Sequence, residues 1–144
     1  MRSEREIRTI IENRVAAIKR KDARVLAASL APDAIVFELI PPLRLPKGAA
    51  QDVEGIEAWL ASWAESPEVE IFGLQIHADG DVGLASSLNR LKGTRLDGRS
   101  SDFWLRSTLG FRRIAGEWRI VHAHSSVPFY ADATMKAALD LTPD

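Results

Sequence analysis

The chain has 144 residues, of which 46% are hydrophobic and 27% are charged. This composition excludes a disordered chain and predicts one globular domain over residues 1–144. The absence of cysteine excludes a disulfide scaffold, thiol catalysis and thiolate metal sites. The net charge of −1 argues against nucleic acid as a partner. The charged N-terminus does not resemble a signal peptide and no apolar run is long enough to span a membrane, so we expect a cytoplasmic protein.

The first part of the chain has the periodicity of two helices. A capping-box pattern at residues 3–6 opens an amphipathic segment that predicts a helix over 3–21. A second helix is predicted over 23–30, with Asp22 as its N-cap and Pro32 as its stop. Together they predict a helical pair at the start of the domain.

A short strand, a loop and a third helix follow. The apolar segment 34–40 predicts a strand, and three prolines make residues 41–52 an irregular loop, since proline fixes φ and lacks an N–H donor. Apolar residues at helical spacing predict a third helix that Pro67 ends. These apolar residues are Ile56, Trp59, Leu60 and Trp63.

After Pro67 the apolar residues alternate with a period of two, which is typical of strands. Asp-Gly and Ala-Gly pairs separate the alternating segments and indicate short hairpin turns, so an antiparallel meander is predicted. A last short helix is predicted over 132–141. The four predicted strands are 69–78, 82–91, 100–113 and 117–126.

The last hairpin predicts where two histidines lie. With a two-residue turn at 115–116, His122 would pair with Leu109 and His124 with Ser107. Strict alternation then places both imidazoles on the apolar face of the sheet, although a bulge would exchange part of this assignment. Imidazole can act as a general acid or base near neutral pH. The alternative is a pair of structural histidines hydrogen-bonded within the core.

The same alternation gathers a second set of residues on the opposite face of the last two strands. Arginine and tryptophan are enriched at the centres of protein interfaces. We therefore expect a homodimer that is joined through the back of the sheet. The residues that carry this expectation are Trp104, Arg106, Thr108 and Arg119.

Residues 107–128 read STLGFRRIAGEWRIVHAHSSVP. This segment and the helical opening resemble the SnoaL-like branch of the nuclear transport factor 2 superfamily, and the segment also resembles the kinase-association domain of calcium/calmodulin-dependent kinase. The resemblance implies an α+β, cystatin-like fold, in which a cone-shaped, strongly curved antiparallel sheet is wrapped by three helices from the N-terminal half. Such cones carry apolar ligand pockets in one member and act as assembly modules in another.

The resemblance also implies a role for Glu38. In the ketosteroid isomerases of this superfamily a carboxylate at the matching position shuttles a proton, and two further acidic groups stabilise the oxyanion. (That enzyme is a standard case of pKa tuning.) Here Arg14 and Leu109 stand near the positions of the oxyanion donors, so the oxyanion hole is absent in that form and steroid isomerisation is not expected.

The candidate catalytic residues are therefore His124, His122 and Glu38. Trp59 and Trp63 could form an aromatic wall, with core packing as the alternative, and Glu38 could instead form a salt bridge at the mouth of the cone. His77 or Glu38 could complete a metal site with the histidines, but no established ligand spacing is present and no metal is expected. The candidate ligand-binding residues are Trp59, Trp63, Arg14, Ser107 and Phe37.

The sequence thus predicts a domain that binds a small apolar organic ligand. The candidate reactions are those of a cofactor-free isomerase, dehydratase or cyclase. The absence of a P-loop and of a GxGxxG motif leaves nucleotide chemistry without support. The alternative function is a non-catalytic dimerisation or assembly module, in which the pocket has no chemical role.

Overall fold

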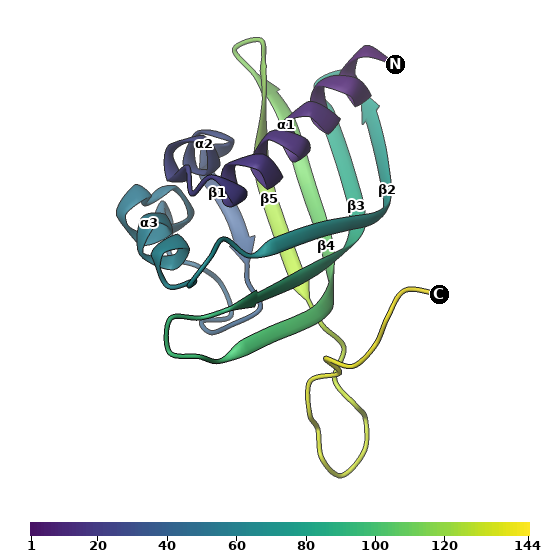
Figure 1. The fold of residues 1–144 in the computed structure, drawn as a ribbon. Coiled ribbons are helices and arrows are strands. Elements are labelled where there is room, and N and C mark those ends of the chain that lie inside the picture. Colours follow the sequence, from purple (N-terminus) through teal and green to yellow (C-terminus); the bar gives the residue numbers. More distant parts are fainter.

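A computed structural model describes all 144 residues, and its helices precede most of its sheet (Figure 1). No helix is both long and apolar enough to cross a membrane. The elements in chain order are α1 (Arg2–Lys19), α2 (Ala23–Ala28), β1 (Leu30–Phe37), the 3-10 turn η1 (Ala49–Gln51), α3 (Val53–Ala61), β2 (Glu68–Asp79), β3 (Val82–Thr94), β4 (Ser100–Ile114) and β5 (Glu117–Ser126).

The five strands form one sheet in the order β1-β5-β4-β3-β2. The predicted meander of β2 to β5 is confirmed, since each of these strands pairs antiparallel with the next. The prediction of an entirely antiparallel sheet is wrong, because β1 pairs parallel with β5. A parallel pair needs a long crossover, and the segment from α3 to β4 supplies it. The α+β class is confirmed, with the sheet curled around α1 (Figure 1).

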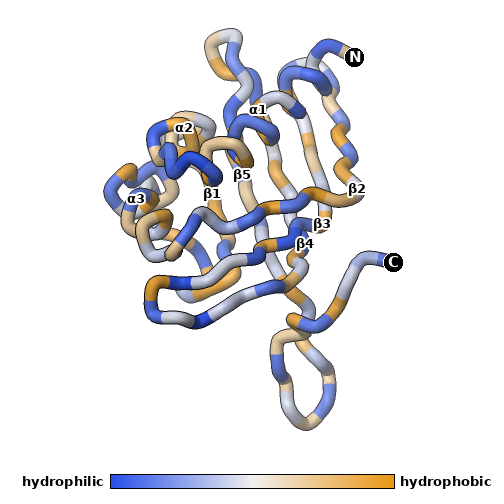
Figure 2. The backbone as a smooth tube through the Cα atoms, viewed as in Figure 1, coloured by the Kyte–Doolittle hydropathy of each residue, from blue (hydrophilic) through white to orange (hydrophobic).

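Helix α1 provides one side of the main hydrophobic core. Its Ile7 is 0% exposed and Ile11 is 5% exposed, and both pack against the sheet residues Phe111, Trp118 and Ile120. Each such buried side chain stabilises the fold by about 1.5–3 kcal/mol. Hydrophobic and hydrophilic residues are interspersed along the chain, as amphipathic elements require (Figure 2). We call the sheet face under α1 the covered face and the opposite one the open face.

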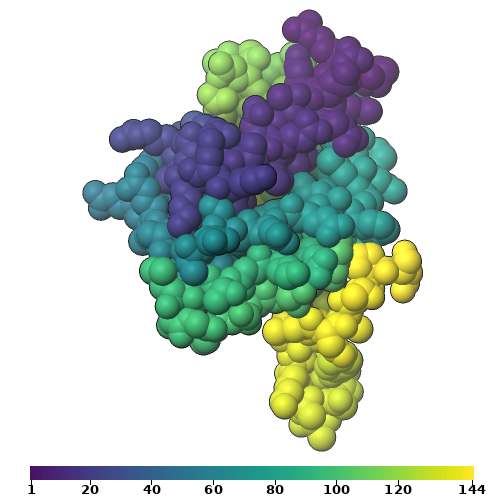
Figure 3. All heavy atoms as spheres, viewed as in Figure 1, coloured from purple at the N-terminus to yellow at the C-terminus, as the bar shows by residue number.

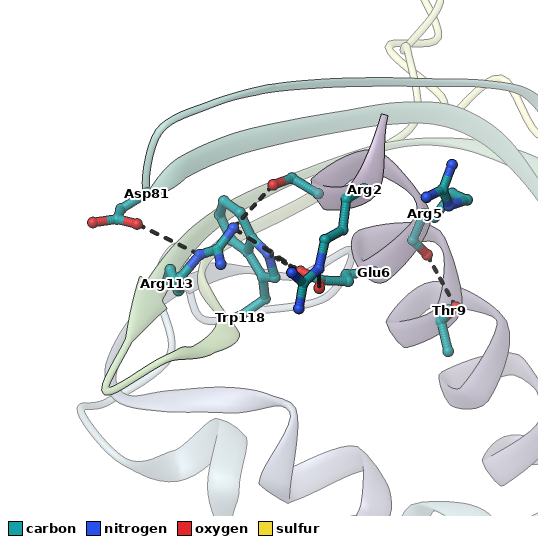
Figure 4. Close-up of polar contacts among 8 residues, drawn as sticks. Arg2, Arg5, Glu6, Thr9, Asp81, Arg113 and Trp118 are labelled. Atoms are coloured by element: carbon teal, nitrogen blue, oxygen red, sulfur yellow. Dashed lines mark hydrogen bonds and ion pairs between the residues drawn. The ribbon is translucent and has the colours of Figure 1, made fainter.

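The predicted capping box of α1 is wrong, because its two side chains bind the last hairpin instead (Figure 4). The Ser3 hydroxyl accepts a hydrogen bond from Arg113 Nη2 at 2.9 Å. The Glu6 carboxylate accepts one from Trp118 Nε1 at 2.9 Å. The Arg113 guanidinium also stacks on the Trp118 ring at 4.8 Å and lies 3.5 Å from Asp81. These contacts fasten the start of α1 to the tip of β4–β5.

Helix α2 begins as predicted, because the Asp22 carboxylate accepts a hydrogen bond from the Val25 N–H at 3.2 Å. The following strand differs from the prediction of 34–40, since β1 begins at Leu30 and passes through Pro32. Proline is tolerated there because β1 lies at the edge of the sheet, where a missing N–H breaks no central ladder.

The predicted C-terminal helix over 132–141 is wrong. Residues 127–144 form a looped arm that projects from the body of the domain (Figures 1 and 3). The Asp132 side chain accepts hydrogen bonds from the N–H and the hydroxyl of Thr134, which favours a local turn over a helix. The arm is closed by the pairing of Phe129 with Ala137.

Candidate functional site

A bulge in the last hairpin determines the placement of the two histidines. The predicted turn is present, with positive φ at Ala115 and Gly116, and pairing proceeds in register as far as Phe111 and Ile120. There the register shifts: Val121 has no partner, and His122 pairs with Gly110. One extra residue reverses the alternation for the rest of β5.

Both histidines consequently lie on the open face. Because of the bulge, His124 pairs with Thr108 instead of Ser107. The imidazoles flank the ring of Phe37, whose centroid is 5.2 Å from that of His122 and 5.4 Å from that of His124. The prediction that the histidines line the apolar interior is therefore wrong, because period-two alternation does not hold through the bulge.

Ser107, which was predicted to pair with His124 and to bind the ligand, lies on the covered face and pairs with Ser125. It therefore lies on the other side of the sheet from His122 and His124. Phe37, predicted as a ligand-binding residue, is partly buried between the two imidazoles. The bulge thus separates Ser107 from the histidine group and brings Phe37 into it.

The two tryptophans differ in their exposure to solvent. Helix α3 ends at Ala61, so Trp63 lies beyond the helix and is 1% exposed, whereas Trp59 is 37% exposed. The two rings meet edge to face at 6.1 Å, and the Arg95 guanidinium lies 3.7 Å from the centroid of the Trp63 ring. Gly93 provides space for this ring, because a Cβ at that position would lie 2.9 Å from its atoms. Trp63 is thus a core residue, in agreement with the alternative interpretation.

Three of the predicted site residues do share one cleft, which we call the Glu38 cleft. It has a volume of about 650 Å³ and is lined by residues 37–44, which follow β1, and by residues 124–127 at the end of β5. Phe37, Glu38 and His124 therefore line one space. Its volume lies in the range of small-molecule sites.

The Glu38 cleft owes its shape to a loop with unusual composition. The Leu45 N–H donates a hydrogen bond to the Val36 carbonyl at 3.0 Å, so the residues between them form an excursion from the sheet. The Pro41–Pro42 peptide is cis. The sequence predicted an irregular loop here but missed its apolar residues as part of a site. The available signal in the sequence was the presence of two large apolar residues, Ile40 and Leu43, beside the prolines. In the structure these two side chains are 71% and 98% exposed.

Glu38 has a perturbed acidity. Part of its side chain remains accessible, but the surrounding protein atoms partly desolvate the carboxyl group, and this burial raises the pKa of Glu38. The positive charge of Arg14 and a hydrogen bond from the Leu39 N–H act in the opposite direction and are smaller. A carboxyl group with a raised pKa in a cleft is a common feature of proton-transfer sites.

Arg14 lines a second cleft, which we call the Arg14 cleft, of about 510 Å³ between α1, α2 and the start of β5. Its Nη1 donates hydrogen bonds to the Leu26 carbonyl at 3.0 Å and to the Ser29 hydroxyl. Burial lowers the pKa of Arg14, and the charge of Glu38 raises it by less. The two charges influence each other, although no ion pair within 4.0 Å joins them.

The structure contains no cluster of three side chains suited to hold a metal ion. The third candidate ligand, His77, is on β2 and pairs with Leu84, so β3 and β4 separate it from the histidines of β5. Glu38 follows the end of β1, at the other edge of the sheet from His77.

The chain belongs to the SnoaL-like domain family, whose model matches residues 7–130. The residues that line the Glu38 cleft all lie within the matched range. No protein with a curated description matches the chain.

Solved structures agree with this assignment. A nuclear transport factor 2-like protein of unknown function from Pseudomonas putida KT2440 is 33% identical, with a TM-score of 0.86 over 98% of this chain and 96% of that chain. A provisionally named dehydratase from Streptomyces avermitilis is 13% identical, with a TM-score of 0.70 over 85% and 93%. A provisionally named ketosteroid isomerase from Shewanella frigidimarina is 23% identical, with a TM-score of 0.63 over 82% and 92%. The last two likenesses establish the fold alone.

Proposed function

We propose that this domain binds a small, largely apolar organic molecule in the Glu38 cleft and that Glu38 transfers a proton in a cofactor-free isomerisation or dehydration. The observation that carries the proposal is a carboxyl group of raised pKa in a cleft lined largely by apolar side chains. The provisional names of the two distant structural neighbours are compatible with this chemistry.

The surroundings of Glu38 shift its pKa upwards, the direction that favours proton transfer by a carboxyl group. Desolvation of the Glu38 carboxyl group disfavours its charged form, whereas the positive charge of Arg14 favours that form by a smaller amount. His124 lines the same cleft and supplies a second group that can donate or accept a proton. The apolar loop side chains Leu39, Ile40 and Leu43 would contact the body of the ligand.

Replacing Glu38 by glutamine tests this function. The probe is cyclohex-3-en-1-one, a small apolar ketone whose α protons can be removed without a cofactor. We expect the wild-type protein to bind the probe and to exchange these protons with D₂O, as followed by NMR. Glu38→Gln should keep the shape of the cleft but lower the exchange rate by about 100-fold or more, because a general base typically contributes that much.

Glu57→Gln is the matched control, since Glu57 lies on the exposed surface of α3 and makes no hydrogen bond or ion pair. It should exchange the probe at the wild-type rate. Exchange by Glu38→Gln at the wild-type rate, or failure of the wild-type protein to bind the probe, would contradict the proposal.

A second candidate function is a dimerisation or assembly module, and the open face favours it. Large apolar side chains remain accessible there, with Phe72 46% and Leu84 47% exposed. Strand pairing places Leu88 beside Arg106, and the Trp104 ring lies 6.3 Å from Phe72. An apolar patch with arginine and tryptophan resembles the centre of an interface.

For this second function we expect a dimer at micromolar concentration. Leu84→Glu would place a charge in the apolar patch and should yield a monomer in light scattering, because burying an unpaired carboxylate is costly. Leu96→Glu is the control, since Leu96 is 71% exposed in the turn after β3, outside the sheet face. A wild-type monomer, or a dimer that survives Leu84→Glu, would argue against this interface.

A further inference from the structure

The Arg14 cleft contains a cationic group that forms no ion pair within 4.0 Å, and Glu38, the acid whose charge acts on it, does not line this cleft. The Arg14 side chain is half-buried. Its two hydrogen bonds both leave from Nη1, towards the Leu26 carbonyl and the Ser29 hydroxyl. The Nε and Nη2 donors therefore have no partner in the protein, although the position of the guanidinium is fixed.

The acidic residues of the cleft do not neutralise Arg14, because other groups already occupy them. The Glu6 carboxylate accepts hydrogen bonds from Arg2 and from the Trp118 indole, each at 2.9 Å. The Glu117 carboxylate is paired with Arg119. Among the charged residues that line the cleft, Arg14 is thus the cation without a paired acid.

The remaining walls of the cleft combine apolar surface with a few polar groups. Ile10, Val25 and Ala28 present aliphatic carbon, whereas Thr9 and Asn13 add a hydroxyl and an amide. A volume of about 510 Å³ accommodates a molecule the size of a small aromatic or branched acid. A fixed guanidinium with free donors matches the two oxygens of a carboxylate.

We propose that the Arg14 cleft binds a small organic carboxylate, with the carboxylate on Arg14 and the apolar part against Val25 and Ala28. The lining of this cleft shares no residue with that of the Glu38 cleft, and the proposal does not depend on the proposed function of the Glu38 cleft. The desolvation that lowers the pKa of Arg14 also strengthens its attraction for an anion, because less water screens the charge.

The test is a titration of the ¹⁵N-labelled protein with sodium benzoate, followed by two-dimensional NMR. We expect saturable shifts of the Arg14 Nε–H resonance and of the backbone amides of Asn13 and Ser29. Benzamide, which has the same ring but no charge, should bind at least about tenfold more weakly if the guanidinium recognises the carboxylate.

Asn13→Asp is the decisive variant, because it adds a negative charge to the cleft and leaves the bonds of Arg14 to α2 untouched. It should weaken benzoate binding by about tenfold, whereas Gln75→Glu, the same change of charge on exposed β2, should not. Arg14→Lys retains the charge but not the planar fork, so binding should also weaken. Equal affinity of Asn13→Asp and wild type, equal binding of benzamide, or shifts confined to residues 37–44 and 124–127 would overturn the proposal.

Discussion

Replacing Trp63 by alanine is expected to lower the free energy of unfolding by about 3–5 kcal/mol, the range for removing a large aromatic side chain from a core. The ring is 1% exposed, fills the space left by Gly93 and lies under the Arg95 guanidinium at 3.7 Å. Removing it leaves a cavity at the junction of α3 with β3, and the cation loses its aromatic partner. Urea unfolding followed by far-UV circular dichroism measures the loss without relying on tryptophan fluorescence.

Trp59→Ala is the matched control for this prediction. Trp59 has the same chemistry and touches the same ring, but it is 37% exposed. Its removal should cost about 1 kcal/mol, since solvent already reaches much of its surface. Equal losses for the two variants would show that the tryptophans form a single packing unit, contrary to the present account.

Gly83→Ala is expected to destabilise the protein by about 1–3 kcal/mol through overpacking. A Cβ at this position of β3 would lie 2.6 Å from Ile7 Cδ1, and Ile7 is 0% exposed. The space between α1 and the sheet therefore has no room for one methyl group. Thermal and urea unfolding of the single variant would measure the cost.

A second substitution identifies the clash as the cause. Ile7→Val removes Cδ1, the atom that an alanine side chain would meet, and costs about 0.5–1.5 kcal/mol by itself. The double variant should be more stable than the sum of the two single losses indicates, because residues in direct contact are not additive. Strict additivity would mean that Gly83 is required for its backbone and not for the space beside Ile7.

Local periodicity predicted the first two helices and the four strands of the meander, because these elements depend on neighbours in the sequence, but it also predicted a helix over 132–141 that is absent. The helical spacing of the first segment and the Asp22 cap both correspond to observed features. The pairing of β1 with β5 was not predictable in this way, since the pattern of an apolar strand does not specify its partner. Ser3 and Glu6 also match the pattern of a capping box. Their side chains nevertheless bind Arg113 and Trp118, which are distant in the sequence.

The candidate site was predictable only in part. Glu38 was indicated by the family resemblance, and the proline-rich loop by composition. The contact of Phe37 with His122 and His124 arises from the bulge at Val121, and alternation alone assigns the histidines to the opposite face. Trp63 was placed on a helix face by its spacing from Trp59, but α3 ends two residues earlier. In both cases a single residue of irregular backbone changed the environment of a side chain.

The attachment of α1 to the last hairpin has a consequence for the order of folding. Ser3 and Arg113 are 110 residues apart in the sequence, and Glu6 and Trp118 are 112 apart. A chain leaving the ribosome therefore exposes the apolar stripe of its first helix long before the partners of that helix have been synthesised. Contacts of such long range form late and leave the nascent chain open to aggregation. The start of α1 can be fastened to the sheet only when β4 and the first residues of β5 have emerged.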